Sequence, residues 1–138
     1  MTRTASSIAA FIALLASTSV FAQAAPDFSK VEIKTTQLAP DFWTLEGQGG
    51  TISVLAGADG ILLVDSQFAP LTDKLVAAIR KVSDKPIRFL VDTHVHPDHV
   101  GGNANFAKLG ATIFARDQLR WRMEHPNEIG RASCRERV

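Results

Sequence analysis

Hydrophobic and polar positions follow two different periods along this chain. Between residues 28 and 64, short apolar or β-branched runs alternate with turn residues, which predicts a meander of antiparallel strands. The strands are expected at residues 31–33 (an edge strand), 42–45, 51–56 and 61–64, with turns at 48–50 and 57–60. The continuously apolar run Ile61–Val64 is typical of a strand buried on both faces.

From residue 70 onward, helical patterns alternate with strand patterns. Leu71, Leu75, Ile79 and Val82 recur every three or four residues, which predicts a helix over residues 70–82 with one buried face. The elements expected after it are a buried strand at 87–91, a helix at 103–109, a strand at 111–115 and a helix at 117–123. A β-meander followed by alternating helices and strands indicates an α/β (α+β) fold.

The last predicted helix and the two tryptophans raise questions of packing. We expect Asp117 to cap the start of that helix, and Leu119 and Met123 to lie on its inner face. Trp43 and Trp121 are interpreted as core residues rather than as the lining of a substrate groove, because packing is the commoner use of aromatic side chains.

The first 24 residues are expected to be a secretory signal peptide. Arg3 supplies the positive region, Ile8–Leu15 the apolar region, and Ala22 and Ala24 the small residues at the cleavage site. The apolar run is shorter than the roughly 20 residues that span a bilayer. We therefore expect cleavage after Ala24, a periplasmic or secreted protein, and no membrane contact once the signal is removed.

The end of the chain does not share the patterning of its body. Residues 129–138 are what one reading frame of a common short-read sequencing adapter encodes, so we expect residues 128–138 to be a non-native tail. The alternative is a natural basic tail. The domain itself is expected to span residues 25–127, which contain no cysteine and hence no disulfide or thiolate ligand. With 15 basic and 14 acidic residues over the whole chain, nothing indicates nucleic-acid binding.

The candidate chemistry is concentrated in one segment, Thr93–Asn103. His94 and His96 precede Pro97, which cannot continue a helix and restricts the backbone before it. We therefore predict a loop of locally extended backbone in which these two imidazoles bind one metal ion together. Imidazole and carboxylate are ligands that favour zinc and also accept iron or manganese.

Two more ligand types follow in the same segment. Asp98 and His99 come after a turn and cannot easily join the same ion from the same side, which indicates a second ion nearby. The Gly101–Gly102 pair lets the backbone pass close to the site without a Cβ atom in the way. The alternative interpretation is a solvated, histidine-rich loop. His125, the remaining histidine, is interpreted as a surface residue because it has no partner pattern.

This motif, followed by Gly-Gly-Asn, resembles the metal loop of the metallo-β-lactamase-fold hydrolases. The resemblance covers roughly residues 28–125 and implies the amino-terminal half of an αββα sandwich. It implies that His94 and His96 bind a first Zn²⁺ and that Asp98 and His99 bind a second. Asp98 would also be catalytic, by fixing a metal-bound hydroxide.

The same resemblance places the carboxylate that ends the fourth strand, Asp65, beside the metal loop. There it would orient the ligands through hydrogen bonds. The alternative is a turn or a helix cap at Ser66.

The function that the resemblance implies is hydrolysis of a small molecule, such as a β-lactam, thioester, lactone or similar ester. Two alternatives stay open. One is an iron-containing redox member of the fold, such as a persulfide dioxygenase or a diiron protein. The other is a catalytically inactive metal-binding fragment, because the family pattern requires further ligands downstream of residue 99. We expect the 138-residue chain itself to be inactive for this reason.

Overall fold

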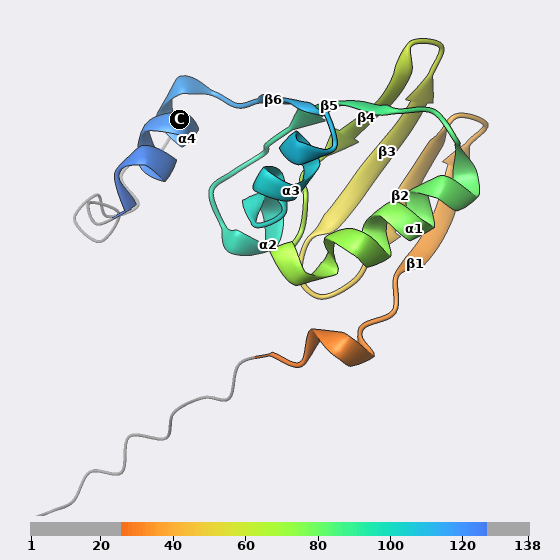
Figure 1. Cartoon of the computed structure of the whole chain (residues 1–138), viewed down its shortest axis with the longest axis horizontal. Helices are drawn as coiled ribbons and strands as arrows, with labels where there is room; N and C mark the ends of the chain where they lie inside the picture. Colours follow the sequence, from red (N-terminus) through yellow and green to blue (C-terminus); the bar gives the residue numbers. More distant parts are fainter. Residues whose placement is uncertain (1–25, 127–138) are drawn as a thin grey trace, which may run out of the picture.

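The computed structural model of the chain describes residues 26–126, and the predicted signal peptide and tail lie outside them. One sheet runs through the domain in the strand order β1-β2-β3-β4-β5-β6 (Figure 1). Its strands are β1 (Lys34–Ala39), β2 (Phe42–Glu46), β3 (Thr51–Gly57), β4 (Gly60–Val64), β5 (Ile87–Val91) and β6 (Thr112–Phe114). The helices are α1 (Thr72–Val82), α2 (Pro97–Val100), α3 (Asn103–Lys108) and α4 (Asp117–Glu124), with 3₁₀ turns at Phe28–Lys30 and Ala69–Leu71. No helix within residues 26–126 is long and apolar enough to cross a membrane.

The sheet changes from antiparallel to parallel at β4. Strands β1 to β4 form the predicted meander, in which each strand pairs antiparallel with the next. Strand β5 pairs parallel with β4, and β6 pairs parallel with β5. Parallel neighbours need a crossover connection, which α1 supplies before β5 and α3 supplies before β6. The carboxyl ends of β4, β5 and β6 therefore meet at one edge of the sheet.

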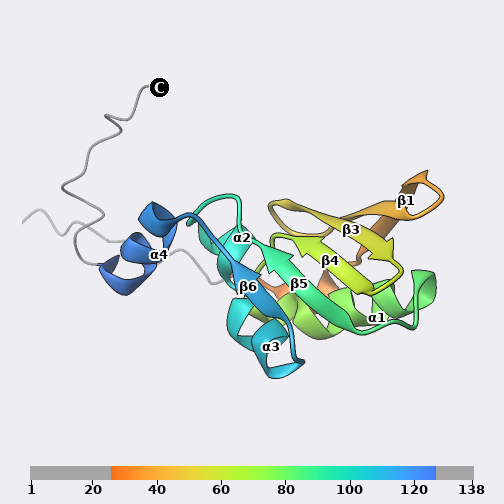
Figure 2. The ribbon, with the colours of Figure 1, turned by 90° about the horizontal axis from the view of Figure 1, so that it is seen from above.

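The core lies on the face of the sheet that α1 and α3 cover (Figure 2). The predicted helix positions Leu71, Leu75 and Ile79 are all buried there. They pack against alternate residues of the strands, which are Leu45, Ile52, Val54, Ile61, Leu63 and Leu90. This single sheet with helices on one face matches the predicted half of an αββα sandwich.

The opposite face of the sheet is largely open. Leu55, Phe89 and Phe114 are 37%, 36% and 50% exposed, and the last two rings touch with their centroids 6.0 Å apart. The expectation that the strands at 61–64 and 87–91 are buried on both faces was therefore wrong for β5 and only partly met in β4. A continuously apolar strand indicates that both of its faces favour burial, whereas the helices of residues 26–126 bury one face of the sheet.

The prediction of a first strand at residues 31–33 was wrong. Residues 28–30 form a 3₁₀ turn, and β1 begins only at Lys34. The ammonium group of Lys74, on α1, donates hydrogen bonds of 3.0, 2.7 and 2.6 Å to the carbonyls of Phe28, Ser29 and Val31. Because these carbonyls are bonded to a side chain, they do not take part in a β ladder.

The last helix also differs from its prediction. Asp117 lies in the first turn of α4, while Arg116 stands at the cap position without a side-chain cap bond. Leu119 is buried as expected, but Met123 is 42% exposed. The reason is that α4 lies beyond the edge strand β6, apart from α1 and α3 (Figures 1 and 2), so its second turn has little to pack against.

We predict that Leu63→Ala lowers the free energy of unfolding of the chain by about 2–5 kcal/mol, because it leaves a cavity in the middle of the covered face. Leu38, which is 60% exposed on the edge strand β1, provides the matched control. Leu38→Ala should change the free energy of unfolding by no more than about 0.5 kcal/mol. Urea denaturation measures both variants, and equal losses would contradict the assignment of the core to this face.

Candidate metal centre

The histidine-rich segment begins where β5 ends. Residues 92–96 form a loop, as predicted, and His96 has the extended backbone (φ −66°, ψ 145°) that a residue before proline prefers. Pro97, however, does not continue the loop but opens the short helix α2. A proline suits the first helical position because its missing N–H would have no helical partner there. Asp98 and His99 therefore lie on a helical turn, which corrects the prediction of a loop throughout.

The structure brings the four predicted ligands together. The imidazole centroids of His94 and His96 are 4.8 Å apart, and those of His94 and His99 are 3.9 Å apart. The Oδ2 atom of Asp98 lies 3.5 Å from Nε2 of His99. The rings pack against one another, and within residues 26–126 no group of three or more His, Cys, Asp or Glu side chains is arranged to hold a metal ion. Their division between two ions stays a prediction.

Asp65 lies at the centre of the hydrogen bonding around this cluster. Its carboxylate is 3% exposed at the end of β4, and Oδ2 pairs with Nδ1 of His99 at 2.7 Å. Thr93 donates its backbone N–H to Oδ1 at 2.8 Å and its hydroxyl lies 2.8 Å from Oδ2. The same hydroxyl is 2.9 Å from Nδ1 of His94. Asp65 thus contacts the motif directly and through Thr93, in the place that the resemblance implies, and leaves Nε2 of His99 facing Asp98.

A buried polar chain that the sequence analysis did not identify supports the motif from behind. Ser66 donates its backbone N–H to the carbonyl of His99 at 2.6 Å and its hydroxyl to Oδ1 of Asn103 at 2.7 Å. Asn103 in turn donates to Oδ2 of Asp92 at 2.7 Å. The available signal was Asp92 itself, a carboxylate directly after an apolar strand, which needs a partner when it is buried.

Asp92 is a buried carboxylate near the motif, and its pKa is raised. Burial raises its pKa from 3.8 to about 6, while the hydrogen bond from Asn103 opposes the shift and the charge of Asp65 adds to it. The group is 5% exposed, and its Oδ1 atom has no hydrogen-bond partner among the described residues. A protonated Asp92 is therefore favoured in the folded chain under mildly acidic conditions.

The glycine pair after α2 permits a close approach of two backbones. A Cβ atom on Gly101 would lie 2.5 Å from the carbonyl oxygen of Pro97, and one on Gly102 would overlap the carbonyl oxygen of Ser66. The N–H of Gly102 donates to the carbonyl of Gln67 at 2.8 Å. The predicted close passage is thus present, and its partner is the segment that follows β4.

The remaining aromatic candidates lie away from this site. His125 stacks on Trp121, with ring centroids 4.7 Å apart, and its Nδ1 atom lies 2.8 Å from the carbonyl oxygen of Trp121. Trp43 packs against the core as expected. Trp121 is 45% exposed, so its interpretation as a core residue was wrong.

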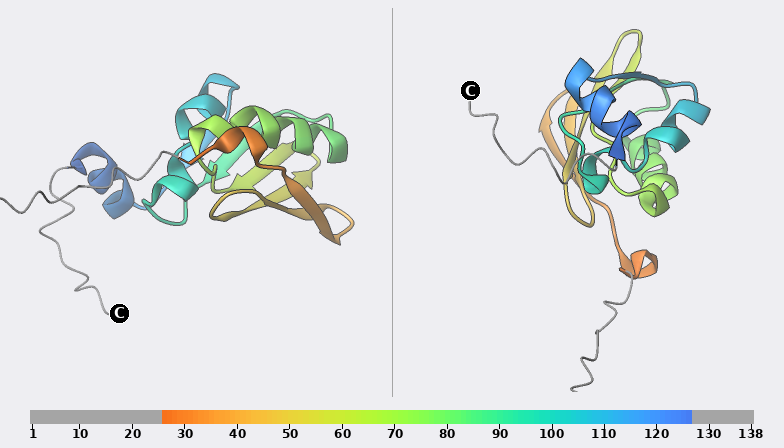
Figure 3. Two further views of the ribbon diagram at one scale, coloured as in Figure 1. Left: turned by 90° about the horizontal axis from the view of Figure 1, so that it is seen from below. Right: turned by 90° about the vertical axis from the view of Figure 1, so that its left-hand side faces the viewer.

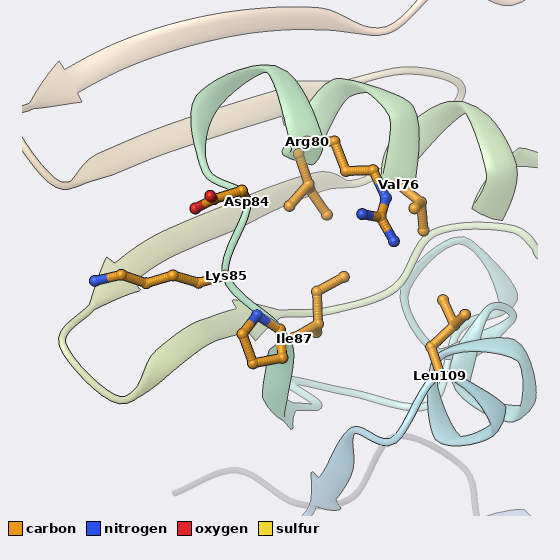
Figure 4. Close-up of a pocket in the computed structure, with 8 residues that line it drawn as sticks. Val76, Arg80, Asp84, Lys85, Ile87 and Leu109 are labelled. Atoms are coloured by element: carbon orange, nitrogen blue, oxygen red, sulfur yellow. The ribbon is translucent and has the colours of Figure 1, made fainter.

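A separate cavity of about 290 Å³ lies at the other end of β5, between α1 and the start of that strand (Figure 4). Val76, Ile79, Ile87 and Leu109 contribute apolar surface, and the guanidinium of Arg80 lies beside them. Because the histidines follow the opposite end of β5, this cavity is not part of the candidate centre.

Comparison with known proteins decides the family. The sequence model of the Metallo-beta-lactamase superfamily matches residues 45–133, which is more than half of the chain. The chain belongs to the metallo-beta-lactamase superfamily.

Among relatives of known activity, a linear primary-alkylsulfatase from a Pseudomonas species is 40% identical over 50 residues, which are 36% of this chain and 10% of that enzyme. Among solved structures, a metallo-beta-lactamase with a HARLDQ motif from Cronobacter sakazakii is similar with a TM-score of 0.62 and 16% identity, over 68% of this chain and 35% of that one. The mono-zinc form of the metallo-beta-lactamase FIM-1 from Pseudomonas aeruginosa is similar with a TM-score of 0.62 and 21% identity, over 70% and 47%.

These superfamily members are longer than the present chain. The chain spans about a third to a half of the length of the two solved structures and a tenth of the alkylsulfatase. At these identities the solved structures establish the fold that this metallo-beta-lactamase-like domain shares with them. They match the sheet and helices described above, which are the amino-terminal part of the fold.

We predict that Gly102→Ala destabilises the chain by about 1–3 kcal/mol, because the new methyl group meets a backbone carbonyl that a bonded segment holds in place. Gly57 is the matched control, since a Cβ atom there has its nearest neighbour at 3.6 Å. Gly57→Ala should cost clearly less in the same urea denaturation. Equal stability of the two variants would show that the segment after β4 does not hold the motif closely.

A second prediction concerns the pH dependence of stability in the presence of a chelator. The folded chain keeps a proton on Asp92 up to about pH 6, whereas the unfolded chain loses it near pH 4. The free energy of unfolding should therefore fall by the order of 1–3 kcal/mol between these pH values. In Asp92→Asn that fall should disappear, and in the exposed control Asp59→Asn it should persist. An unchanged pH profile in Asp92→Asn would contradict the assignment.

Proposed function

We propose that this chain carries the metal-binding part of an exported metallo-hydrolase. His94, His96, Asp98 and His99 would hold one or two zinc ions at the carboxyl end of β5. The observation that supports this most is the gathering of three imidazoles and the Asp98 carboxylate beside a buried carboxylate, Asp65, that already binds Nδ1 of His99.

The residues present fit such ions by their chemistry. Neutral imidazole and carboxylate are the ligands that zinc accepts in catalytic sites, and a carboxylate bound to the far nitrogen of a ligand histidine is the common way to fix that ring. Asp65 is in that relation to His99, and Thr93 lies within hydrogen-bond distance of His94. The mono-zinc form known for one structural relative agrees with zinc as the metal of this fold.

The chemistry would be hydrolysis of a small molecule. A divalent cation supplies Lewis acidity, which lowers the pKa of water and polarises the group under attack. Within this chain, Asp98 would accept a hydrogen bond from the attacking water and carry a proton to the leaving group. Asp65 and Thr93 would keep the imidazoles oriented while this happens.

The substrate class follows from the relatives rather than from the described residues. The structural relatives are metallo-beta-lactamases, and the sequence relative is an alkylsulfatase. A β-lactam and a sulfate ester would therefore be tested first, and a thioester and a lactone, which the resemblance of the metal loop implies, would be tested next. The protein is taken as periplasmic or secreted. Nucleic acid is not among the expected partners.

Catalysis by the 138-residue chain alone would be weak or absent. Catalytic zinc usually has three protein ligands and one water, whereas this motif offers two side chains to each ion. The longer relatives have room for the remaining ligands in the part that this chain does not match. The direct test of the proposal is therefore metal binding, with hydrolysis tested in a protein of the relatives' length.

We predict that the chain binds Co²⁺ as a spectroscopic substitute for zinc, and that His94→Ala weakens this binding at least about 10-fold, because it removes one of very few ligands. His125→Ala is the matched control and should bind Co²⁺ like the unaltered chain, since His125 directly follows α4 and stacks on Trp121. Visible absorption during a Co²⁺ titration gives both affinities. An equal loss in the two variants, or no binding by the unaltered chain, would contradict the proposal.

The same preparation separates zinc from the redox alternative. Metal analysis of protein purified without added metal should find zinc in excess over iron. Bound iron with a redox-active absorption spectrum would favour the dioxygenase or diiron type instead.

A further inference from the structure

The loop between β2 and β3 lies directly on the two side chains that the second ion would need. Figures 1 and 3 show this loop, residues 47–50, beside α2. A Cβ atom on Gly49 would be 2.7 Å from Cβ of Asp98, and one on Gly50 would be 2.6 Å from Cε1 of His99. The loop backbone therefore touches both side chains, with no room for a methyl group between them.

One residue from a third segment holds this loop in place. Gln67 follows β4 and is fully buried, and its side-chain amide donates a hydrogen bond to the carbonyl of Gly50. Its own carbonyl accepts the N–H of Gly102, just after α2. Gln67 is thus bonded on one side to the loop and on the other to the end of the metal motif.

Two features indicate that this placement is specific. The backbone of Gln67 has φ +59°, a left-handed conformation that a non-glycine residue rarely adopts. Its other amide atom, Oε1, is buried without a hydrogen-bond partner among the described residues. A core position that only needed filling would favour an apolar side chain here, because an unpaired buried amide oxygen is unfavourable.

We propose that Gln67 is a positioning residue, which fixes His99 and Asp98 by holding the β2–β3 loop against them. The contact between loop and histidine does not depend on a metal. Its consequence, a better formed binding site for the second ion, rests on the proposed function. Asp65 binds Nδ1 of the His99 ring, and the loop backbone lies against the adjacent Cε1 and Nε2 atoms, so the carboxylate and the loop both restrict the imidazole.

The contact is tested in the metal-free chain with a chelator present. We predict that the nuclear Overhauser effect between the Gly50 Hα atoms and Hε1 of His99 is present in the unaltered chain and lost in Gln67→Met. Methionine has a similar length but no N–H to donate. Gln48→Met is the matched control, since Gln48 is an exposed residue of the same loop, and it should keep the effect. Persistence in Gln67→Met, or loss in Gln48→Met, would overturn the proposal.

Gln67→Glu gives a second variant in case Gln67→Met fails to fold. It preserves the shape of the side chain, and in its ionised form it repels the carbonyl of Gly50 instead of binding it. The same loss of the Gly50–His99 effect is expected at neutral pH. Retention of the effect in a folded Gln67→Glu chain would also overturn the proposal.

The consequence for the ion is tested by titration with Co²⁺. In Gln67→Met the affinity for the second equivalent should fall about 10-fold or more, while that for the first equivalent stays the same, because the motif side chains found against the loop are Asp98 and His99. Equal losses at both equivalents would indicate a general structural effect and overturn the positioning role. If the unaltered chain binds no Co²⁺, the proposed function fails, and the metal-free measurement still decides whether Gln67 holds the loop.

Discussion

The close approach of two backbones is the constraint on which the candidate centre depends. Ser66 and Gln67 run past the metal motif near enough for backbone hydrogen bonds of 2.6 Å to the carbonyl of His99 and 2.8 Å from the N–H of Gly102. This spacing is reached only because residues 101 and 102 lack side chains. Because these two segments are held together, Asp65 can bind His99 and Gln67 can bind the β2–β3 loop. A wider spacing would break both contacts at once.

The sheet explains why these segments meet. Strands β4 and β5 are parallel, so their carboxyl ends lie at one edge, and each delivers a polar residue there, Asp65 from one and Asp92 from the other. The helices that make the parallel pairing possible also form the core on one face. Burial of apolar side chains on the helix-covered face therefore stabilises the fold, while the buried carboxylates lie at the ends of the strands. Each of these carboxylates accepts a hydrogen bond. The site itself is polar and held by hydrogen bonds, whereas the apolar core on the helix-covered face supplies the stability that keeps it assembled.

Local patterns predicted what local interactions determine. The meander, the helix containing Leu75 and the histidine motif all follow from residues close together in sequence. The strand expected at 31–33 is absent because Lys74, more than 40 positions away, binds the carbonyl of its first residue, Val31, and two carbonyls before it. The burial of Phe89 and Met123 depends on which other segment packs against them, and the hydrophobic periodicity of their own segments does not contain that information. Gln67 could not have been singled out, since its role requires a positive φ and a contact 17 residues away.

The two halves of the motif are not equally prepared for a ligand. His99 is bound by Asp65 and touched by the loop, and Asp98 lies under that same loop. His96 is exposed, and within residues 26–126 His94 is hydrogen-bonded to a threonine hydroxyl. This chain therefore fixes the Asp98–His99 pair by contacts with other segments, whereas His94 and His96 are in contact mainly with residues of the motif itself. If a protein of the relatives' length completes the centre, its additional segments have most to contribute beside His94 and His96, because Asp98 and His99 already lie against two other segments of this domain, the residues after β4 and the β2–β3 loop.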